Sequence, residues 1–327
     1  MKKLNSRKVA DIWRKNARQF GFKSVRRRSI QSSISQATAA CNQGAKQDLF
    51  PWLHCYDEAL CWINNLKIWV FWKQSVEPEP SRIPIYMLIS KCCTFLVGIR
   101  HLVVSGLNDP ACSLARTLHE SLGLILAMLV DESIRERYDR SMDDKDSSAF
   151  WKTFCWRKQK GTGTSLVHEH LKKAGLRAGM SATEVEAWLK RHLENKQAFS
   201  GSTHVAIQSA WQCAFVSSLS HRSMLSTSSF GHVSVHSPTL LMHLAEALWD
   251  FGGIFMSIID NETQVKGFEI GPKDLKAVEF QSMLVAFFTL QQLLTEEELP
   301  PCPQLGEVDE LETSLPKGSS ENDCELN

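Results

Sequence analysis

Apolar side chains recur about every 3.6 residues along most of the chain, and no segment keeps the alternation of a β-strand for long. This periodicity predicts an all-α protein. Two regular segments, 84–106 and 110–130, are separated by a short turn in which Gly106 ends one helix and an Asp before Pro110 begins the next. A connection this short makes the two helices antiparallel neighbours. We therefore expect a multi-helix bundle around a central antiparallel helix hairpin at about residues 84–130.

Further helices are expected on both sides of this hairpin. Ser181 and Glu184 have the spacing of a capping box, which marks the start of a helix. The chain has ten tryptophans, most of them at helical core spacing, which favours packing in the core over a surface that stacks nucleic-acid bases. The other segments with helical periodicity are 28–45, the segment that follows Pro51, 131–158, 181–196, 203–222, 238–261 and 273–294.

Charged residues are sorted by position along the chain. Residues 1–28 contain eleven Lys or Arg and one acid, whereas residues 296–327 contain ten acids and one Lys. Such segments are typical of solvated interaction arms. We therefore predict three parts: a basic N-terminal arm with weak helices (1–47), a helical core domain (48–295), and an acidic tail that has little to pack and is expected to be disordered.

The basic arm points to a partner with many negative charges. Within it, residues 5–20 place apolar side chains toward one side and Lys or Arg around the rest, which is a basic amphipathic pattern. Clustered Lys and Arg neutralise phosphates with little sequence preference. We expect residues 1–28 to bind RNA or DNA, RNA in particular, in a defence or stress response. The basic residues expected to make contacts include Lys8, Arg14, Arg26, Arg27 and Arg28.

Two other uses of the arm stay open. The same pattern suits a protein partner or an anionic membrane surface, in which case the chain would act as a scaffold or regulatory protein. An acid-poor start that is rich in Arg and Ser is also typical of an organellar transit peptide.

Composition bears on where the protein works. The longest apolar stretch, 122–130, is about half of what a bilayer span needs, and the start of the chain is too polar for a signal peptide. The ten Cys have no regular spacing, which indicates reduced cysteines in an intracellular protein. We therefore expect a cytoplasmic protein without a transmembrane segment.

A polar stripe runs along the segment 110–130. Arg116 and Glu120 are four residues apart and can pair on one helix face, while small residues such as Gly123 let another helix approach closely. Buried charges are costly unless they are paired and hydrogen-bonded, so a further partner is expected nearby. His101 on the preceding helix lies at about the level of Arg116. This cluster is either a binding or catalytic site or a structural ion pair that fixes the helix register.

The segment Leu107–Ser121 contains an Arg-x-x-x-Glu pattern, Arg116 and Glu120, after a turn with Asn and Asp. It resembles a widespread family of uncharacterised, all-helical, mostly bacterial proteins, in which a Ser-x-x-x-His segment follows downstream. The segment that ends at His204 matches this second element. The resemblance implies a helical bundle with a polar site made of Arg116, Glu120 and His204, but no reaction. His119 departs from the family pattern by standing directly before the Glu, and it joins the candidate binding residues.

Several known catalytic and metal-binding motifs are absent from the sequence. It lacks the Glu-x-x-His of di-iron bundles, the His-Glu-x-x-His of zinc proteases, any Cys-x-x-Cys, and the Arg and His spacing of helical ribonucleases from toxin and defence systems. His232 and His236 would chelate a metal only on a helix, and Pro238 favours a loop there. We therefore predict no metal site and no cofactor.

Whether the protein is an enzyme stays open. The alternative to a nucleic-acid-binding protein is a hydrolase or nuclease, in which Arg116 would hold an anion and Glu120 or His204 would transfer a proton.

Overall fold

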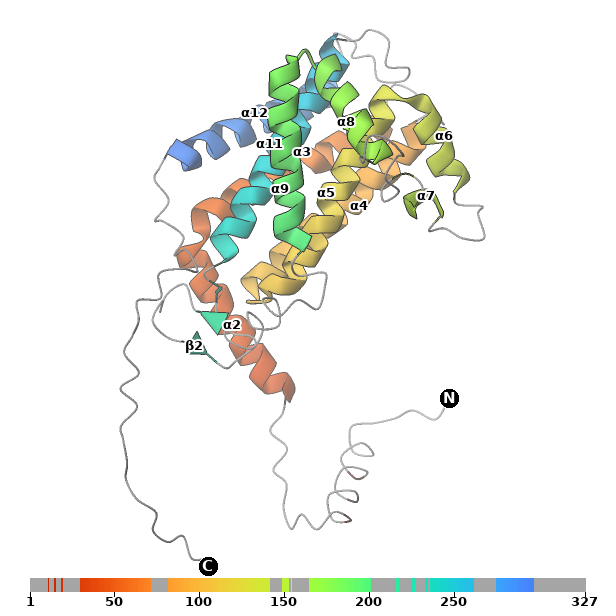
Figure 1. Ribbon diagram of the computed structural model, residues 1–327. Helices are drawn as coiled ribbons and strands as arrows, with labels where there is room; N and C mark the ends of the chain where they lie inside the picture. The colour runs from red at the N-terminus through yellow and green to blue at the C-terminus, as the bar shows by residue number, and fades with distance from the viewer. Residues whose placement is uncertain are drawn as a thin grey trace, which may run out of the picture.

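The computed structural model describes residues 11, 15, 19, 30–71, 82–141, 149–152, 154, 165–200, 216–217, 225–226, 233–234, 236–261 and 275–296. Most of these residues are helical, and the helices pack side by side in a bundle (Figure 1). A short antiparallel pair, β1 (Val216–Ser217) with β2 (Leu225–Ser226), accompanies them. The predicted all-α class is confirmed.

The centre of the bundle is an antiparallel hairpin of α4 (Ile83–Val104) and α5 (Asn108–Val130). Gly106 between them has a φ of 75°, a left-handed conformation that glycine adopts without strain. The Leu107 N–H donates to the Leu102 carbonyl at 2.8 Å, which closes the end of α4. The predicted central hairpin is therefore confirmed. Besides α4, α5 packs against α6 (Glu132–Arg140), α8 (Leu166–Arg177), α9 (Ala182–Ser200) and α11 (Ser237–Asn261).

Aromatic rings join the helices on the other side of α4. α3 (Phe50–Phe71) packs against α4, α11 and α12 (Leu275–Glu296). The Trp62 ring lies with its centroid 6.1 Å from that of Phe251 on α11 and 6.2 Å from that of Phe287 on α12. Packing in the core, as predicted for the tryptophans, is confirmed for Trp52, Trp62, Trp69 and Trp188.

α2 (Ile30–Asp48) is the first helix that joins the core. It packs against α3 and α4 and buries Cys41 and Ala45 among their apolar side chains. The helix predicted at 28–45 is therefore present. The division of the chain into an arm, a core domain and a tail is not tested by the described residues and stays a prediction.

α8 and α9 form a second hairpin that covers α5. The turn between them contains Gly179, whose φ is 87°. The predicted capping box is confirmed, because the Glu184 N–H donates to Ser181 Oγ at 3.3 Å and the Ser181 N–H donates to Glu184 Oε2 at 2.7 Å. α8 was not among the predicted helices, and Ser165 caps it by accepting from the His168 N–H at 3.4 Å.

Two predicted helices are wrong in part. The continuous helix predicted over 131–158 is interrupted at Ser141. Asp131 begins it as the N-cap of α6, with its side chain accepting from the Ser133 N–H. α6 ends at Arg140 and is followed by the short α7 (Ala149–Trp151). The helix predicted over 203–222 does not hold at Val216 and Ser217, which form β1 instead.

Three of the described helices are long and apolar enough to cross a membrane by length and composition: Ile83–Val104, Asn108–Val130 and Ala277–Thr295. The span in α5 is 72% buried inside the bundle, whereas the span in α12 is 28% buried. The expectation of a chain without a transmembrane segment is not tested by this finding and stays a prediction.

Candidate functional site

Arg116 and Glu120 lie on α5 at the interface with α9. Arg116 Nε is 3.5 Å from Glu120 Oε1, and Lys196 Nζ of α9 is 3.3 Å from the same oxygen. The Glu120 side chain is 18% exposed, so this carboxylate is largely withdrawn from water. Lys196 is therefore a further charged partner close to the Arg116 and Glu120 pair, as expected from the sequence.

Gly123 allows the close helix approach that the small-residue stripe predicted. A Cβ at this position would lie 3.5 Å from His192 Cε1 on α9 and 3.7 Å from Leu171 Cδ1 on α8. Both are ordinary van der Waals distances, so the imidazole of His192 packs directly on α5 at Gly123.

The tilted rings of His119 and His192 pack against each other across this interface. Their ring centroids are 3.9 Å apart with an angle of 32° between the planes. His119 is 3% exposed, and its Nδ1 forms no hydrogen bond. Burial lowers the pKa of His119 well below its usual value, helped by His192 and Lys196. Burial, Lys196 and His168 lower the pKa of His192 to about 3, so both imidazoles are neutral at pH 7.

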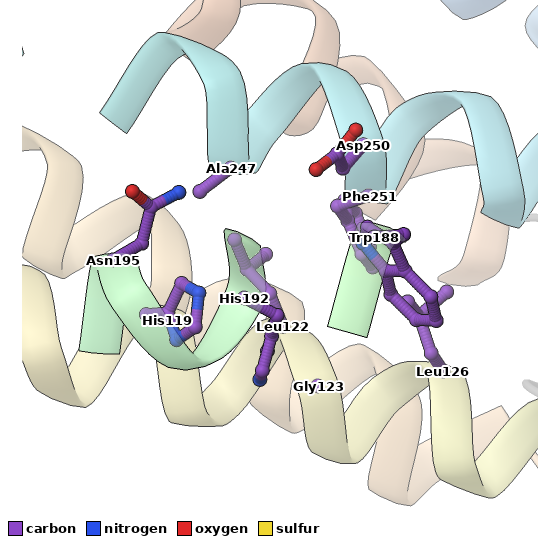
Figure 2. Close-up of a pocket in the computed structure, with 10 residues that line it drawn as sticks. All are labelled: His119, Leu122, Gly123, Leu126, Trp188, His192, Asn195, Ala247, Asp250 and Phe251. Atoms are coloured by element: carbon purple, nitrogen blue, oxygen red, sulfur yellow. The ribbon is translucent and has the colours of Figure 1, made fainter. Parts of the chain in front are cut away.

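A small cavity, which we call the inner cavity, lies between α5, α9 and α11 (Figure 2). Its volume is about 20 Å³, room for about one water. Asp250 of α11 lies at its edge with Arg191 Nη2 3.5 Å from Oδ1, and burial raises the pKa of Asp250 to about 6 against the opposing effect of Arg191. The polar residues that line this cavity are His119, His192, Asn195 and Asp250.

A second cavity, the outer cavity, lies between α5, α8 and α9 and has a volume of about 50 Å³. Leu171 and Val167 supply part of its apolar wall. His192 lines both cavities and therefore lies between them. The polar residues of the outer cavity are Glu120, Ser165, His168, His192 and Lys196.

The predicted site residues fall into three groups. Arg116, His119 and Glu120 lie together at this interface. His101 is exposed on α4 and does not line either cavity. His204 lies outside the described residues, as do Lys8, Arg14, Arg26, Arg27 and Arg28. The assignment of a site to these residues stays a prediction.

Sequence reasoning missed the α9 and α11 side of the cluster. Trp188, His192 and Lys196 follow one another at intervals of four residues, a spacing that places them on one helix face. Asp250 is an acid between the apolar segments 247–249 and 251–256. Both patterns were available in the sequence. Among the residues that the structure describes, no group of three or more His, Cys, Asp or Glu is arranged to hold a metal ion.

Comparison with known proteins adds no further information on the site. No protein-family model matches the chain, and no curated protein or solved structure matches it. The chain is an all-helical protein for which these comparisons identify no family or homologue.

Proposed function

We propose that this protein is a cytoplasmic nucleic-acid-binding protein that takes part in a defence or stress response and contacts RNA through residues 1–28. The observation that carries the proposal is the concentration of eleven Lys or Arg against one acid in that segment. Each cation that neutralises a phosphate releases condensed counterions, so a dense basic segment binds nucleic acid without reading its sequence.

The described positions in this segment agree with an amphipathic helix. Asp11, Lys15 and Gln19 are helical, exposed and spaced four residues apart, as expected for the polar side of the helix predicted at 5–20. The acidic segment 296–327 has the opposite charge and would compete with nucleic acid for the arm until nucleic acid arrives.

The proposal predicts a specific dependence on salt. Binding of labelled single-stranded RNA and duplex DNA to the full chain should weaken steeply as salt rises, and replacing Arg26, Arg27 and Arg28 by Gln should reduce the slope. The expected reduction is about 0.7 to 0.9 for each phosphate that the variant no longer neutralises, in a plot of log affinity against log salt. Fluorescence anisotropy across a salt series measures both slopes.

A chain that starts at Ser29 provides the limiting case and should lose binding. A matched control replaces Lys152 and Lys190, two exposed lysines of the described residues, by Gln and should retain the slope. If the full chain does not bind RNA or DNA at physiological salt, or if the triple variant keeps the full slope, the proposal is wrong.

A hydrolase or nuclease is the second candidate, and the surroundings of Glu120 favour it. This carboxylate contacts two cations and lines the outer cavity beside a neutral imidazole, an arrangement that can orient an anion and transfer a proton. Arg116 and Glu120 are also the first element of the family that the chain resembles, and His204 would supply the second.

If the second candidate is correct, Glu120→Gln should lower RNA cleavage by roughly 10²-fold or more, the size expected for loss of a group that transfers a proton. Cleavage of a fluorescently quenched RNA measures this, and circular dichroism checks that the fold is retained. Glu136→Gln is the matched control, because Glu136 pairs with an arginine four residues away on an exposed helix face. Equal cleavage by wild type and Glu120→Gln would exclude a catalytic role for Glu120.

A further inference from the structure

Several hydrogen-bond donors line the outer cavity, and the Glu120 carboxylate in its wall lies between two cations. Lys196 has three N–H donors, and its Nζ forms an ion pair with Glu120 Oε1 at 3.3 Å. The hydroxyl of Ser165 can donate, since the His168 N–H uses it only as an acceptor. His168 and His192 each add a ring N–H. The carboxylate of Glu120, which already contacts two cations, is the acidic group in the lining.

The backbone adds to this preference for negative charge. Ser165 and Val167 in the cavity wall belong to the first turn of α8, a helix of 12 residues. The helix dipole places partial positive charge at this end, where Ser165 Oγ already accepts from the His168 N–H. The Lys196 ammonium group lines the same cavity and adds a full positive charge.

His192 is the side chain most clearly suited to a ligand in this cavity. Its ring packs against His119 and meets Trp188 at an edge, and neither ring contact uses the imidazole nitrogens. A neutral imidazole can donate to a ligand without adding a charge to the buried cluster. An anion beside it would favour the protonated ring, since nearby negative charge raises the pKa of a histidine.

The size of the cavity limits the ligand. About 50 Å³ is room for about three to five waters at 10–15 Å³ each. A tetrahedral oxyanion is in this size class, whereas ligand pockets for drug-sized molecules run from about 300 to 1,000 Å³. A whole nucleotide does not fit, but a terminal phosphate group does.

We propose that the outer cavity is a binding site for a phosphate-class oxyanion, held by Lys196, the Ser165 hydroxyl, and the imidazoles of His168 and His192 at the N-terminus of α8. The site goes beyond the proposed binding of nucleic acid by residues 1–28 and does not depend on it. The anion is either free phosphate or the terminal phosphate of a larger molecule.

Titration calorimetry of the full chain with inorganic phosphate at constant ionic strength tests this site. Lys196→Gln should weaken phosphate binding at least tenfold. Lys190→Gln on the same helix should stay within twofold of wild type, because Lys190 is exposed and pairs with Glu194 outside the cavity. Phosphate that binds the basic arm would bind both variants equally. Equal affinity in wild type and Lys196→Gln therefore overturns the proposal, as does an absence of binding to wild type.

The two sources of the anion are distinguished with a 5′-phosphorylated dinucleotide. Binding of the dinucleotide that depends on Lys196 supports a terminal phosphate, and binding of inorganic phosphate alone supports the free ion. Both results support the site. Failure of RNA binding by residues 1–28 would leave these results unchanged, so the two proposals fail separately.

A second measurement uses the wild-type chain alone, so it does not depend on whether a variant folds. In the wild-type chain with ¹³C-labelled histidine, phosphate should shift the ring signals of His168 and His192. The signal of His54, which stacks on Phe50 in α3, should stay in place. Phosphate binding that leaves the His168 and His192 signals unmoved places the anion elsewhere and overturns the proposal.

Discussion

Burial changes the charge of individual side chains at the α5, α9 and α11 interface. His119 and His192 lose their positive charge at neutral pH because the interface excludes water, and Asp250 holds its proton to a higher pH than an exposed aspartate does. In the same cluster, Glu120 is placed between two cations. Neutral imidazoles thus lie beside the Asp250 carboxyl at the inner cavity, and the charges of Glu120 and Lys196 lie at the outer cavity.

Asp250 should make stability depend on pH. Its pKa is raised from 3.8 to about 6 in the folded chain, so between these values the folded chain holds a proton that the unfolded chain has released. The free energy of unfolding therefore falls as pH rises through this window. Asp250→Asn removes the effect, and we expect the variant to be more stable than wild type by about 1–3 kcal/mol at pH 8.

Urea unfolding at pH 8 and pH 4 measures this difference. At pH 4 the wild-type carboxyl is mostly protonated in the folded chain, so the advantage of Asp250→Asn should become small. The contact with Arg191 contributes little, because the Arg191 side chain is 52% exposed. An Asp250→Asn variant that is less stable than wild type at both pH values would show that this contact outweighs the cost of burial.

Two glycines lie at helix contacts on the α8 and α9 side of the bundle, and they differ in how much room a side chain would have there. A Cβ on Gly175 of α8 would lie 2.8 Å from Val185 Cγ2 on α9. A Cβ on Gly123 of α5 would meet its nearest neighbour at an ordinary distance of 3.5 Å. The α8 and α9 contact is therefore the tighter of the two.

This difference predicts opposite effects of the same substitution. Gly175→Ala should destabilise the protein by about 1–3 kcal/mol, because the β-branched Val185 cannot move its methyl group without leaving its rotamer. Gly123→Ala should be neutral or stabilising by up to about 1 kcal/mol, since alanine favours a helix over glycine. Urea unfolding of both variants tests this, and equal losses of stability would contradict it.

Periodicity predicted those elements that bury one face along their whole length. The α4 and α5 hairpin and the capped start of α9 were predicted because their signals are local: a glycine turn and the Ser181–Glu184 pair. α8 was missed because its 12 residues mix charged and apolar side chains. The helix at 131–158 was predicted too long because the end of α6 at Arg140 was not recognised.

The part of the candidate site that lies on α5 could be predicted from the sequence, but the contacts between α5 and α9 could not. Arg116 and Glu120 are neighbours on α5, so their spacing alone pairs them. Lys196 reaches Glu120 from 76 residues away along the chain. That contact depends on how α9 is placed along α5, and this placement results from packing across several helices. No local pattern in the sequence contains this information.

For the whole molecule, the described surface is least polar along the outer face of α12. Residues 280–295 contain no Asp, Glu, Lys or Arg, and Val278, Val285 and Leu293 are exposed on this helix. α12 is also the least buried of the three helices with the length and composition of a membrane span. Three exposed apolar side chains thus lie on the helix that precedes the acidic segment, whereas the polar cluster lies around α5, α8 and α9.

The two cavities at this cluster share two residues, His192 and Gly123. Since Gly123 has no side chain, the imidazole of His192 is, among the described residues, the side chain common to both cavity walls. A change in the orientation of this ring therefore alters the shape of both cavities at once. A ring packed against a second ring turns less freely than an exposed one. The contact with His119, at 3.9 Å between ring centroids, thus limits how far either cavity can change its shape.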